Sequence, residues 1–186
     1  VTKIPTYKKS VRKDLKDRCF VTKEDKYKAI IDDIKNVHSK GQPILVGTSS
    51  VQESEQLSEL LTYNKIEHNV LNAKNNENEA TIIARAGRLN AVTIATNMAG
   101  RGTDIILGGN PNEMSQKEWQ NEHSKVVELG GLCIIASERN FARRIDNQLI
   151  GRAGRQGDPG VTCFYVSAED YLVGMYNKDK SQKLIS

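Results

Sequence analysis

The sequence has little of what marks a disulfide-rich, metal-binding or membrane-spanning chain. Its 186 residues include three cysteines and three histidines. The cysteines are odd in number and form no C-x-x-C pair, and no histidine has a second ligand three or four residues away, so we expect neither a disulfide framework nor a metal site. No run approaches the roughly 20 apolar residues of a membrane span, and residues 1–20 mix lysines with polar residues. We therefore expect a soluble domain from a reducing compartment.

Two nucleotide-binding signatures are also absent. The 186 residues contain no G-x-x-x-x-G-K-[ST] phosphate loop and no D-E-x-D sequence. The first cradles the phosphates of a bound nucleotide, and acidic residues of the second kind hold magnesium. We therefore expect no ATP hydrolysis by this chain alone.

Charge is unevenly distributed along the chain. The net charge is +4, yet residues 1–28 contain ten Lys/Arg against four Asp/Glu, which gives this segment a net +6. Such an arm could attract nucleic acid or anionic lipid headgroups, or it could be a solvated linker whose charges keep it extended. We assign residues 1–20 to a connector strand or linker, 21–172 to one compact domain and 173–186 to a frayed or truncated segment.

Helical and strand-like patterns alternate within that domain. Tyr27, Ile30, Ile31 and Ile34 recur at the spacing of a helix that buries one face, and Gly41 ends it. Capping-box patterns at 50–53 and 115–118 start two further helices, 81–89 forms a weaker one, and we expect Asn140 to cap another. Five segments are expected as strands: Pro43–Gly47, His68–Leu71, Ala91–Thr96, Leu132–Ala136 and Val161–Val166. Alternation at this spacing predicts an open parallel α/β sheet of about five or six strands with helices on both faces.

Two glycine-rich loops are the strongest functional signals in the sequence. One reads T-N-M-A-G-R-G-T-D-I at Thr96–Ile105 and follows a strand, and the other reads Q-L-I-G-R-A-G-R-Q-G-D-P-G at Gln148–Gly160. Glycines alone indicate only backbone positions that need positive φ or close approach, and a single Arg or Asp there can simply be solvated. Together, at this spacing in a parallel α/β chain, the loops resemble motifs V and VI of superfamily-two helicases and their translocase relatives.

Longer strings narrow the resemblance. A-T-N-M-A-G-R-G-T-D-I at Ala95–Ile105, R-R-I-D-N-Q-L at Arg143–Leu149 and G-R-A-G-R-Q-G-D-P-G at Gly151–Gly160 resemble the SecA family of preprotein translocase ATPases. The strings V-L-N-A-K-N at 70–75 and G-Q-P-I-L-V-G-T at 41–48 agree with the same family. The resemblance covers residues 4–172 and implies the second of two RecA-like lobes, a three-layer α/β/α fold cut from a longer motor.

The resemblance implies roles for the residues of both loops. ATP binds between two lobes, the missing first lobe holding the phosphates and Mg²⁺ and the second supplying positive charge. Arg152 and Arg155 are the expected arginine fingers, because a planar, permanently charged group can meet the phosphate oxygens at two points. Asp104 is expected to accept hydrogen bonds from the ribose hydroxyls. The remaining cofactor-binding residues are expected to be Gly100, Arg101, Gly102 and Gln148.

A second set is expected to contact the first lobe. Arg143, Arg144 and Asp146 lie on the helix that leads into the second loop, where the family places groups that pair across the lobe interface. Exposed ion pairs worth about 0 to 1 kcal/mol are the plainer interpretation of the same residues.

Partners and location follow from the resemblance alone. It implies that the intact motor acts with the SecYEG channel, unfolded preproteins and an anionic membrane surface, and it allows a homodimer. The location would be the cytoplasm with peripheral attachment to the inner membrane, or the plastid stroma and thylakoid. Residues 4–15 resemble the return strand from an inserted preprotein-binding domain, which makes the basic arm a connector.

Two other function classes stay open. Ile150 stands where the family usually has arginine, and it matches the I-G-R-x-G-R pattern of nucleic-acid helicases. The basic start of the chain gives mild support to the same helicase class. R-R-I-D-N-Q-L argues against a helicase, so nucleic acid is not our expected partner. A binding module without turnover is the third class, and retention of Arg101, Asp104, Arg152 and Arg155 argues against it.

Overall fold

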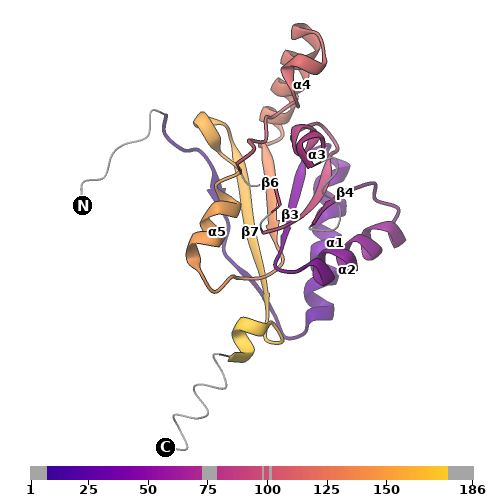
Figure 1. The fold of residues 1–186 in the computed structure, drawn as a ribbon, viewed down its shortest axis with the longest axis vertical. Coiled ribbons are helices and arrows are strands. Elements are labelled where there is room, and N and C mark those ends of the chain that lie inside the picture. The colour runs from indigo at the N-terminus through magenta and orange to yellow at the C-terminus, as the bar shows by residue number, and fades with distance from the viewer. Residues whose placement is uncertain (1–7, 73–78, 98, 101, 176–186) are drawn as a thin grey trace, which may run out of the picture.

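The computed structural model describes residues 8–72, 79–97, 99–100 and 102–175. Its described part contains one parallel sheet of seven strands, in the order β1-β7-β6-β3-β5-β4, with β2 also paired to β7 (Figure 1). The strands are β1 (Lys13–Asp14), β2 (Arg18–Phe20), β3 (Ile44–Thr48), β4 (Asn69–Leu71), β5 (Val92–Thr96), β6 (Leu132–Ala136) and β7 (Gly160–Ser167). The open parallel α/β sheet expected from the sequence is confirmed.

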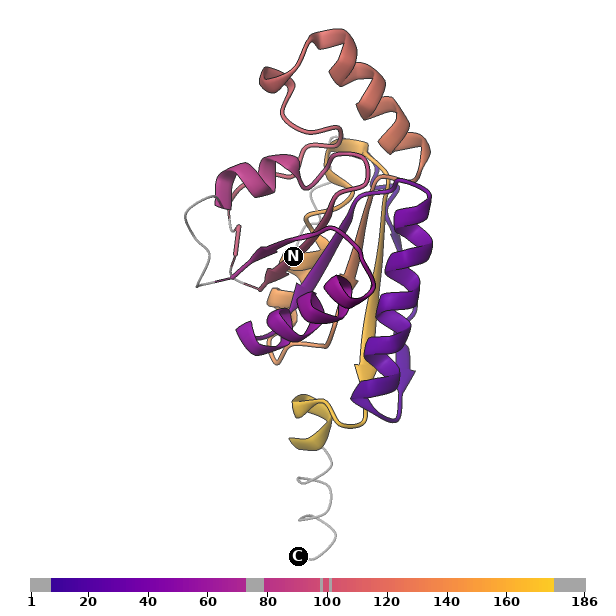
Figure 2. The same ribbon diagram turned by 90° about the vertical axis from the view of Figure 1, so that its right-hand side faces the viewer.

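Helices cover both faces of the sheet. The long helix α1 (Lys23–Ser39) and α2 (Val51–Tyr63) lie on one face, and α5 (Arg143–Ile150) lies on the other, as Figures 1 and 2 show. Side chains from α3 (Glu79–Arg85) and α4 (Gln116–Glu128) join the same buried cluster as α5. Two short 3₁₀ turns, Pro111–Glu113 and Arg155–Gly157, are also present, and residues 171–175 are helical. The predicted three-layer arrangement is therefore present.

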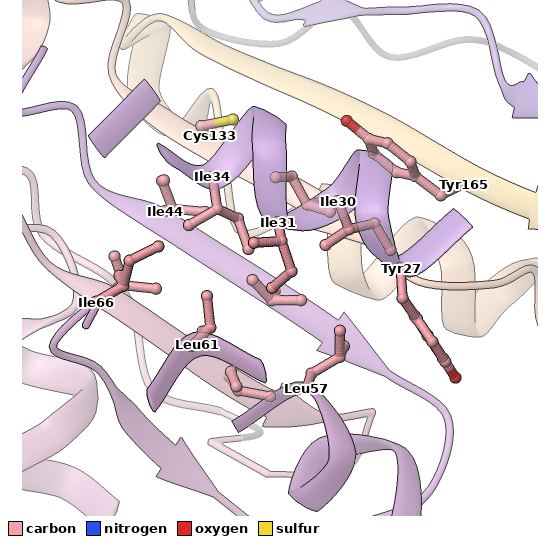
Figure 3. Packing of buried hydrophobic residues seen from close by; sticks show 14 of the residues in the cluster. Tyr27, Ile30, Ile31, Ile34, Ile44, Leu57, Leu61, Ile66, Cys133 and Tyr165 are labelled. Atoms are coloured by element: carbon pink, nitrogen blue, oxygen red, sulfur yellow. The ribbon is translucent and has the colours of Figure 1, made fainter. Parts of the chain in front are cut away.

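The α1/α2 face is an apolar core of branched side chains (Figure 3). Ile30 and Ile34 of α1 and Leu61 of α2 are at most 1% exposed, and they pack onto Ile44 and other residues of the central strands. Strands buried on both faces need apolar residues at consecutive positions, and β3 has them. The helical periodicity in the sequence thus identified the core face of α1 correctly.

The amino-terminal segment adds two short strands to the sheet. We assigned residues 1–20 to a connector strand or linker, and residues 13–14 and 18–20 of that segment form β1 and β2, both paired in parallel with β7. These strands are two and three residues long and mostly exposed, so they are too short to show an apolar alternation. They bring the sheet to seven strands where we expected five or six.

Helix ends agree with the sequence in part. The predicted capping box of α4 is present, with Ser115 and Glu118 exchanging side-chain and backbone hydrogen bonds. The predicted cap of α5 was wrong: the N-cap is Ala142, which makes no side-chain capping bond. Asn140 instead donates its side-chain amide to Asp146 at 2.8 Å. The helix end is thus fixed by a side-chain pair that bridges the preceding turn.

Candidate functional site

A cleft of about 290 Å³ lies between the loop after β5 and the region around the end of α5. In open parallel sheets, ligands bind outside the carboxyl ends of the strands, and the cleft occupies that position beyond β5. The two glycine-rich loops singled out in the sequence therefore meet in one place. The residues that line it are Ala95, Thr96, Asn97, Gly100, Gly102, Thr103, Asn147, Gln148, Leu149, Gly151, Arg152 and Arg155.

Arg152 is a partly buried cation whose hydrogen bonding is incomplete. Its Nη2 donates to the carbonyl oxygen of Ala99 at 2.6 Å, while its buried Nη1 has no hydrogen-bond partner among the described residues. Burial lowers the pKa of the guanidinium from its ordinary value, and the charge of Glu79 opposes that shift. A buried donor without an acceptor is costly. Arg152 therefore lines the cleft with a guanidinium whose buried Nη1 lacks an acceptor among the described residues.

Both the backbone conformation and the lack of space for a side chain require glycine at position 100. Its φ is +69°, in the region that favours glycine, and its N–H donates to the carboxylate of Glu79. A Cβ at this position would lie 2.4 Å from Cδ1 of Ile83 and 3.0 Å from Nη1 of Arg152. The backbone at Gly100 consequently lies directly against Arg152.

Gly102 also has a positive φ, +84°, but a Cβ there would meet no atom within 4 Å. Its backbone conformation, not its surroundings, is what favours glycine. Arg101, which the resemblance assigns to the same cofactor-binding set, lies outside the described residues.

Arg155 and Asp104 form an ion pair in this structure. Both side chains are about half exposed, at 48% and 62%. Nε of Arg155 also donates to the carbonyl oxygen of Gly151 at 2.9 Å. The sequence predicted a phosphate contact for Arg155 and a ribose contact for Asp104, and the structure brings these two side chains into contact with each other.

The helix α5 presents its predicted residues in different environments. Gln148 is exposed and lines the cleft. Arg143 and Arg144 are exposed, and neither forms an ion pair with another residue of the described part. Asp146 is 4% exposed and accepts hydrogen bonds from Asn140 and, at 3.3 Å, from Nη1 of Arg139. The two arginines are thus available to an external partner, whereas Asp146 is bound within this domain.

Three polar contributors to the site were missed in the sequence. Asn97 lines the cleft and donates to Oδ1 of Asn140 at 2.5 Å, which ties the loop after β5 to the turn before α5. Asn147 lies on the cleft wall, and the carboxylate of Glu79 accepts a hydrogen bond from the backbone N–H of Gly100. Asn97 stands inside the quoted motif and was open to identification. Glu79 lies in a run rich in Asn and Glu, where no pattern separates it from its neighbours.

Comparison with known proteins gives the same family as the sequence strings. Residues 9–186 match the sequence model described as the SecA P-loop domain. The chain belongs to the SecA family. It is 55% identical over 194 aligned residues to the protein translocase subunit SecA of Ectopseudomonas mendocina, covering 97% of this chain and 21% of that protein. Protein translocase subunit SecA 1 of Thermobifida fusca is 49% identical over 100% of this chain and 22% of its own length. The chain therefore spans about a fifth of these relatives.

Solved structures agree with the fold. The E. coli DEAD-box protein SrmB, in its crystal structure bound to the regulator of ribonuclease activity A, has a TM-score of 0.62 at 19% identity, over 91% of this chain and 87% of that one. The yeast DEAD-box splicing factor Prp28 also scores 0.62 at 19% identity, over 95% and 34% of the two chains. At these identities the likeness concerns the RecA-like fold.

Two other kinds of feature, a membrane-spanning helix and a metal-binding cluster, are absent from the described residues. They contain no helix that is long and apolar enough to cross a bilayer. Nor do they gather three or more His, Cys, Asp or Glu side chains in a group that could hold a metal ion.

Proposed function

We propose that this chain is the second ATPase lobe of a SecA-type translocase motor, in which ATP is bound between this lobe and a first RecA-like lobe. The observation that carries the proposal is the cleft wall at Arg152, where a buried charged donor has no acceptor among the described residues. A phosphate oxygen bound in the cleft would supply that acceptor once Nη1, which is buried in this structure, turns toward it. Family membership supports the same assignment.

The lining residues fit an anionic nucleotide in chemistry as well as position. Arg152 and Arg155 would stabilise the negative charge that spreads over the transferred phosphoryl group in the transition state. Gly100 and Gly102 would let the backbone approach the nucleotide, with Arg101 between them and Gln148 on the facing wall. Asp104 would bind the ribose, which requires it to leave its ion pair with Arg155. A switch of that pair on nucleotide binding is part of the proposal.

The remaining chemistry would come from the first lobe. The phosphate loop and the acids that hold Mg²⁺ do not occur in these 186 residues, so ATP would be held mainly by the other lobe. Closure of the two lobes would then bring the arginines to the phosphates, and Arg143 and Arg144 would pair across the interface. Asp146 would contribute to that interface by fixing the turn before α5.

The partners of the intact motor are proposed on the family's account. They are unfolded preproteins, the SecYEG channel and an anionic membrane surface, with a homodimer as a further option. The motor would be cytoplasmic and attached peripherally to the inner membrane, or lie in the plastid stroma and at the thylakoid. Hydrolysis coupled to preprotein movement is the proposed activity.

A first experiment tests the division of labour between the lobes. We expect the purified chain to show no Mg²⁺-dependent ATP turnover and at most weak nucleotide binding. Adding the purified first lobe should restore turnover, because it supplies the missing phosphate loop. Turnover above background by this chain alone would contradict the proposal.

The finger assignment is tested in the full-length motor. Arg155→Ala should lower kcat by about 10³ to 10⁵, equivalent to about 4 to 7 kcal/mol in the barrier, and leave ATP binding nearly unchanged. Asp104→Ala should instead raise the KM for ATP, because a ribose contact holds substrate and transition state equally. Wild-type kcat in Arg155→Ala would remove it as a finger and leave Arg152 as the remaining candidate of this chain.

A second lobe of a nucleic-acid helicase is the alternative, favoured by Ile150 and by the fold of the DEAD-box structures. It predicts salt-dependent binding of single-stranded RNA that is lost when Lys8, Lys9, Arg12 and Lys13 are neutralised. We expect no such binding.

A further inference from the structure

We infer that Arg12 is a positioning residue for the loop that carries Arg152 and Arg155, an inference that rests on the nucleotide-binding function proposed above. Arg12 lies near the amino-terminal end of the described chain, about 140 residues from that loop in sequence. It does not line the cleft. Its effect would pass through the backbone of the loop and not through contact with a nucleotide.

Arg12 binds the carbonyl oxygens at the carboxyl end of α5. Its Nη1 donates to the carbonyl oxygen of Ile150 at 2.9 Å and to that of Ala153 at 3.4 Å. The last carbonyls of a helix lack partners within the helix and carry partial negative charge, so a cation is favoured there. Ile150 lies two residues before Arg152 in the sequence, and Ala153 lies one residue after it. The guanidinium therefore fixes the backbone from which Arg152 extends.

Arg12 is itself held in a defined orientation. Its Nε and Nη2 donate to the two carboxylate oxygens of Asp14 at 2.7 and 3.0 Å. Asp14 lies in β1, paired with β7, and also accepts from Oγ1 of Thr162 at 2.7 Å. The bond from Arg12 is the main cause that lowers the pKa of Asp14 below its ordinary value. One edge of the guanidinium thus binds the sheet while the other binds the loop.

Packing between Arg12 and the loop is close enough to exclude a side chain. Gly154 has a φ of +72°, and a Cβ there would lie 2.7 Å from Cβ of Arg12. At Gly157, a Cβ would lie 3.0 Å from Cδ of Lys8. The loop therefore lies directly on the amino-terminal segment along several residues. A displacement of that segment would displace the loop.

The same segment also holds the other end of α5. Arg139 donates to both carboxylate oxygens of Asp17 at 2.9 and 2.6 Å and, at 3.3 Å, to Asp146 in the first turns of α5. The bond with Asp17 is the main cause that raises the pKa of Arg139. Residues 12–17 are consequently tied to α5 at its beginning and at its end, which is why we assign the positioning of the whole helix–loop unit to this segment.

A purely structural role for Arg12 makes a different prediction from a positioning role. If Arg12 only strengthens the fold, its removal lowers the melting temperature and leaves the kinetics of the folded motor unchanged. If it positions the arginines, kcat falls while the KM for ATP changes little, because the fingers act in the transition state. A displacement of about 1 Å at a catalytic group can cost up to about a hundredfold in rate.

The test uses the full-length motor with three variants. Arg12→Ala should lower kcat by about tenfold to a hundredfold, and amide hydrogen exchange of residues 150–157 should become faster while that of β3 stays unchanged. Arg12→Lys keeps the charge but not the two-sided fork, so its kcat should lie between those of Arg12→Ala and wild type. Lys13→Gln removes a neighbouring charge from the same strand and should behave as wild type.

The outcomes separate this inference from the proposed function. Wild-type kcat in Arg12→Ala, or an equal fall in Lys13→Gln, overturns the positioning role, even where Arg155→Ala is inactive and the finger assignment stands. Wild-type kcat in Arg155→Ala counts against the proposed function instead. If Arg12→Ala does not fold, Arg12→Lys decides the matter: a reduced kcat with unchanged KM supports positioning, and wild-type kinetics refute it.

Discussion

Two cations of the described residues differ in burial. Lys26, at the start of α1, is fully buried, and Arg152, beyond the end of α5, is partly buried. Lys26 is 0% exposed, and its Nζ donates to Oδ1 of Asp170 at 2.5 Å and to the carbonyl oxygen of Ser137 at 2.6 Å. Asp170 in turn accepts from the backbone N–H and the hydroxyl of Ser167, both at 2.8 Å. The charge of Lys26 is thus neutralised and hydrogen-bonded within the chain.

The hydrogen bonding of Arg152 is incomplete, in contrast to that of Lys26. One of its terminal nitrogens binds the carbonyl oxygen of Ala99, and the other is buried without a partner among the described residues. Burying a charge that is not fully satisfied costs free energy of folding. The charge of Lys26 is paired inside the protein, whereas Nη1 of Arg152 has no acceptor among the described residues.

The largest expected effect on stability is at Lys26. Lys26→Met leaves the carboxylate of Asp170 buried without its cation, and we expect the free energy of unfolding to fall by about 3 to 5 kcal/mol. Urea unfolding of the purified chain measures it. The double variant Lys26→Met/Asp170→Leu removes both charges and should be less destabilised than the single one. Equal stability of the single variant and wild type would contradict the role given to this pair.

A smaller effect is expected where Gly100 touches Arg152. Gly100→Ala forces a positive φ on alanine and places its Cβ against Ile83 and Arg152, so we expect a loss of about 1 to 3 kcal/mol in unfolding free energy. Gly102→Ala has the same backbone strain without the collision and serves as the matched control. An equal loss in both variants would show that backbone conformation alone explains the glycine, and that its packing on Arg152 does not matter.

The sequence predicted the residues that line the cleft better than it predicted the residues that hold the surrounding loops in place. Gly100, Gly102, Gln148, Arg152 and Arg155 stand in two motif strings, and the structure places all of them on the cleft wall. Those strings are local, and the parallel α/β pattern already implied that loops at the carboxyl ends of strands would meet. Asp104 was found in the same string, although its contact with Arg155 was not foreseen.

The supporting contacts had no comparable signal. Arg12 binds backbone carbonyls 138 and 141 residues away. Every residue has a backbone carbonyl, so the sequence does not show which carbonyls accept such a bond. The strands β1 and β2 are short and exposed, so their pairing with β7 depends on tertiary context. Asn140 was read as a helix cap because Asn is favoured there, but its amide binds Asp146 instead. Contacts between distant side chains and backbone atoms decided these positions.

At Arg152 itself, the expected change in stability is small. Arg152→Met loses the bond to Ala99 but also removes a partly unsatisfied buried charge, and we expect the free energy of unfolding to change by less than about 1 kcal/mol. Urea unfolding beside Lys26→Met makes the comparison direct. A loss as large as that of Lys26→Met would mean that Arg152 is a structural cation, and the contrast between the two residues would be lost.

The smallest expected effect is stabilisation of the purified chain by inorganic phosphate. A ligand that binds only the folded state adds RT ln(1 + [L]/Kd), which is about 0.4 kcal/mol when its concentration equals Kd. Phosphate also stabilises proteins generally, because it is excluded from their surfaces. The general effect must therefore be measured separately from binding at Arg152.

Arg152→Met provides that separation, because it should keep the general effect of phosphate and lose the specific one. We expect the melting temperature of wild type to rise more with added phosphate than that of Arg152→Met, at matched ionic strength with chloride as the reference anion. Lys13→Gln, which removes a charge that does not line the cleft, should respond as wild type does. If all three proteins gain the same number of degrees, the free nitrogen of Arg152 attracts no phosphate in this lobe alone. That result would count against the anion site proposed at Arg152.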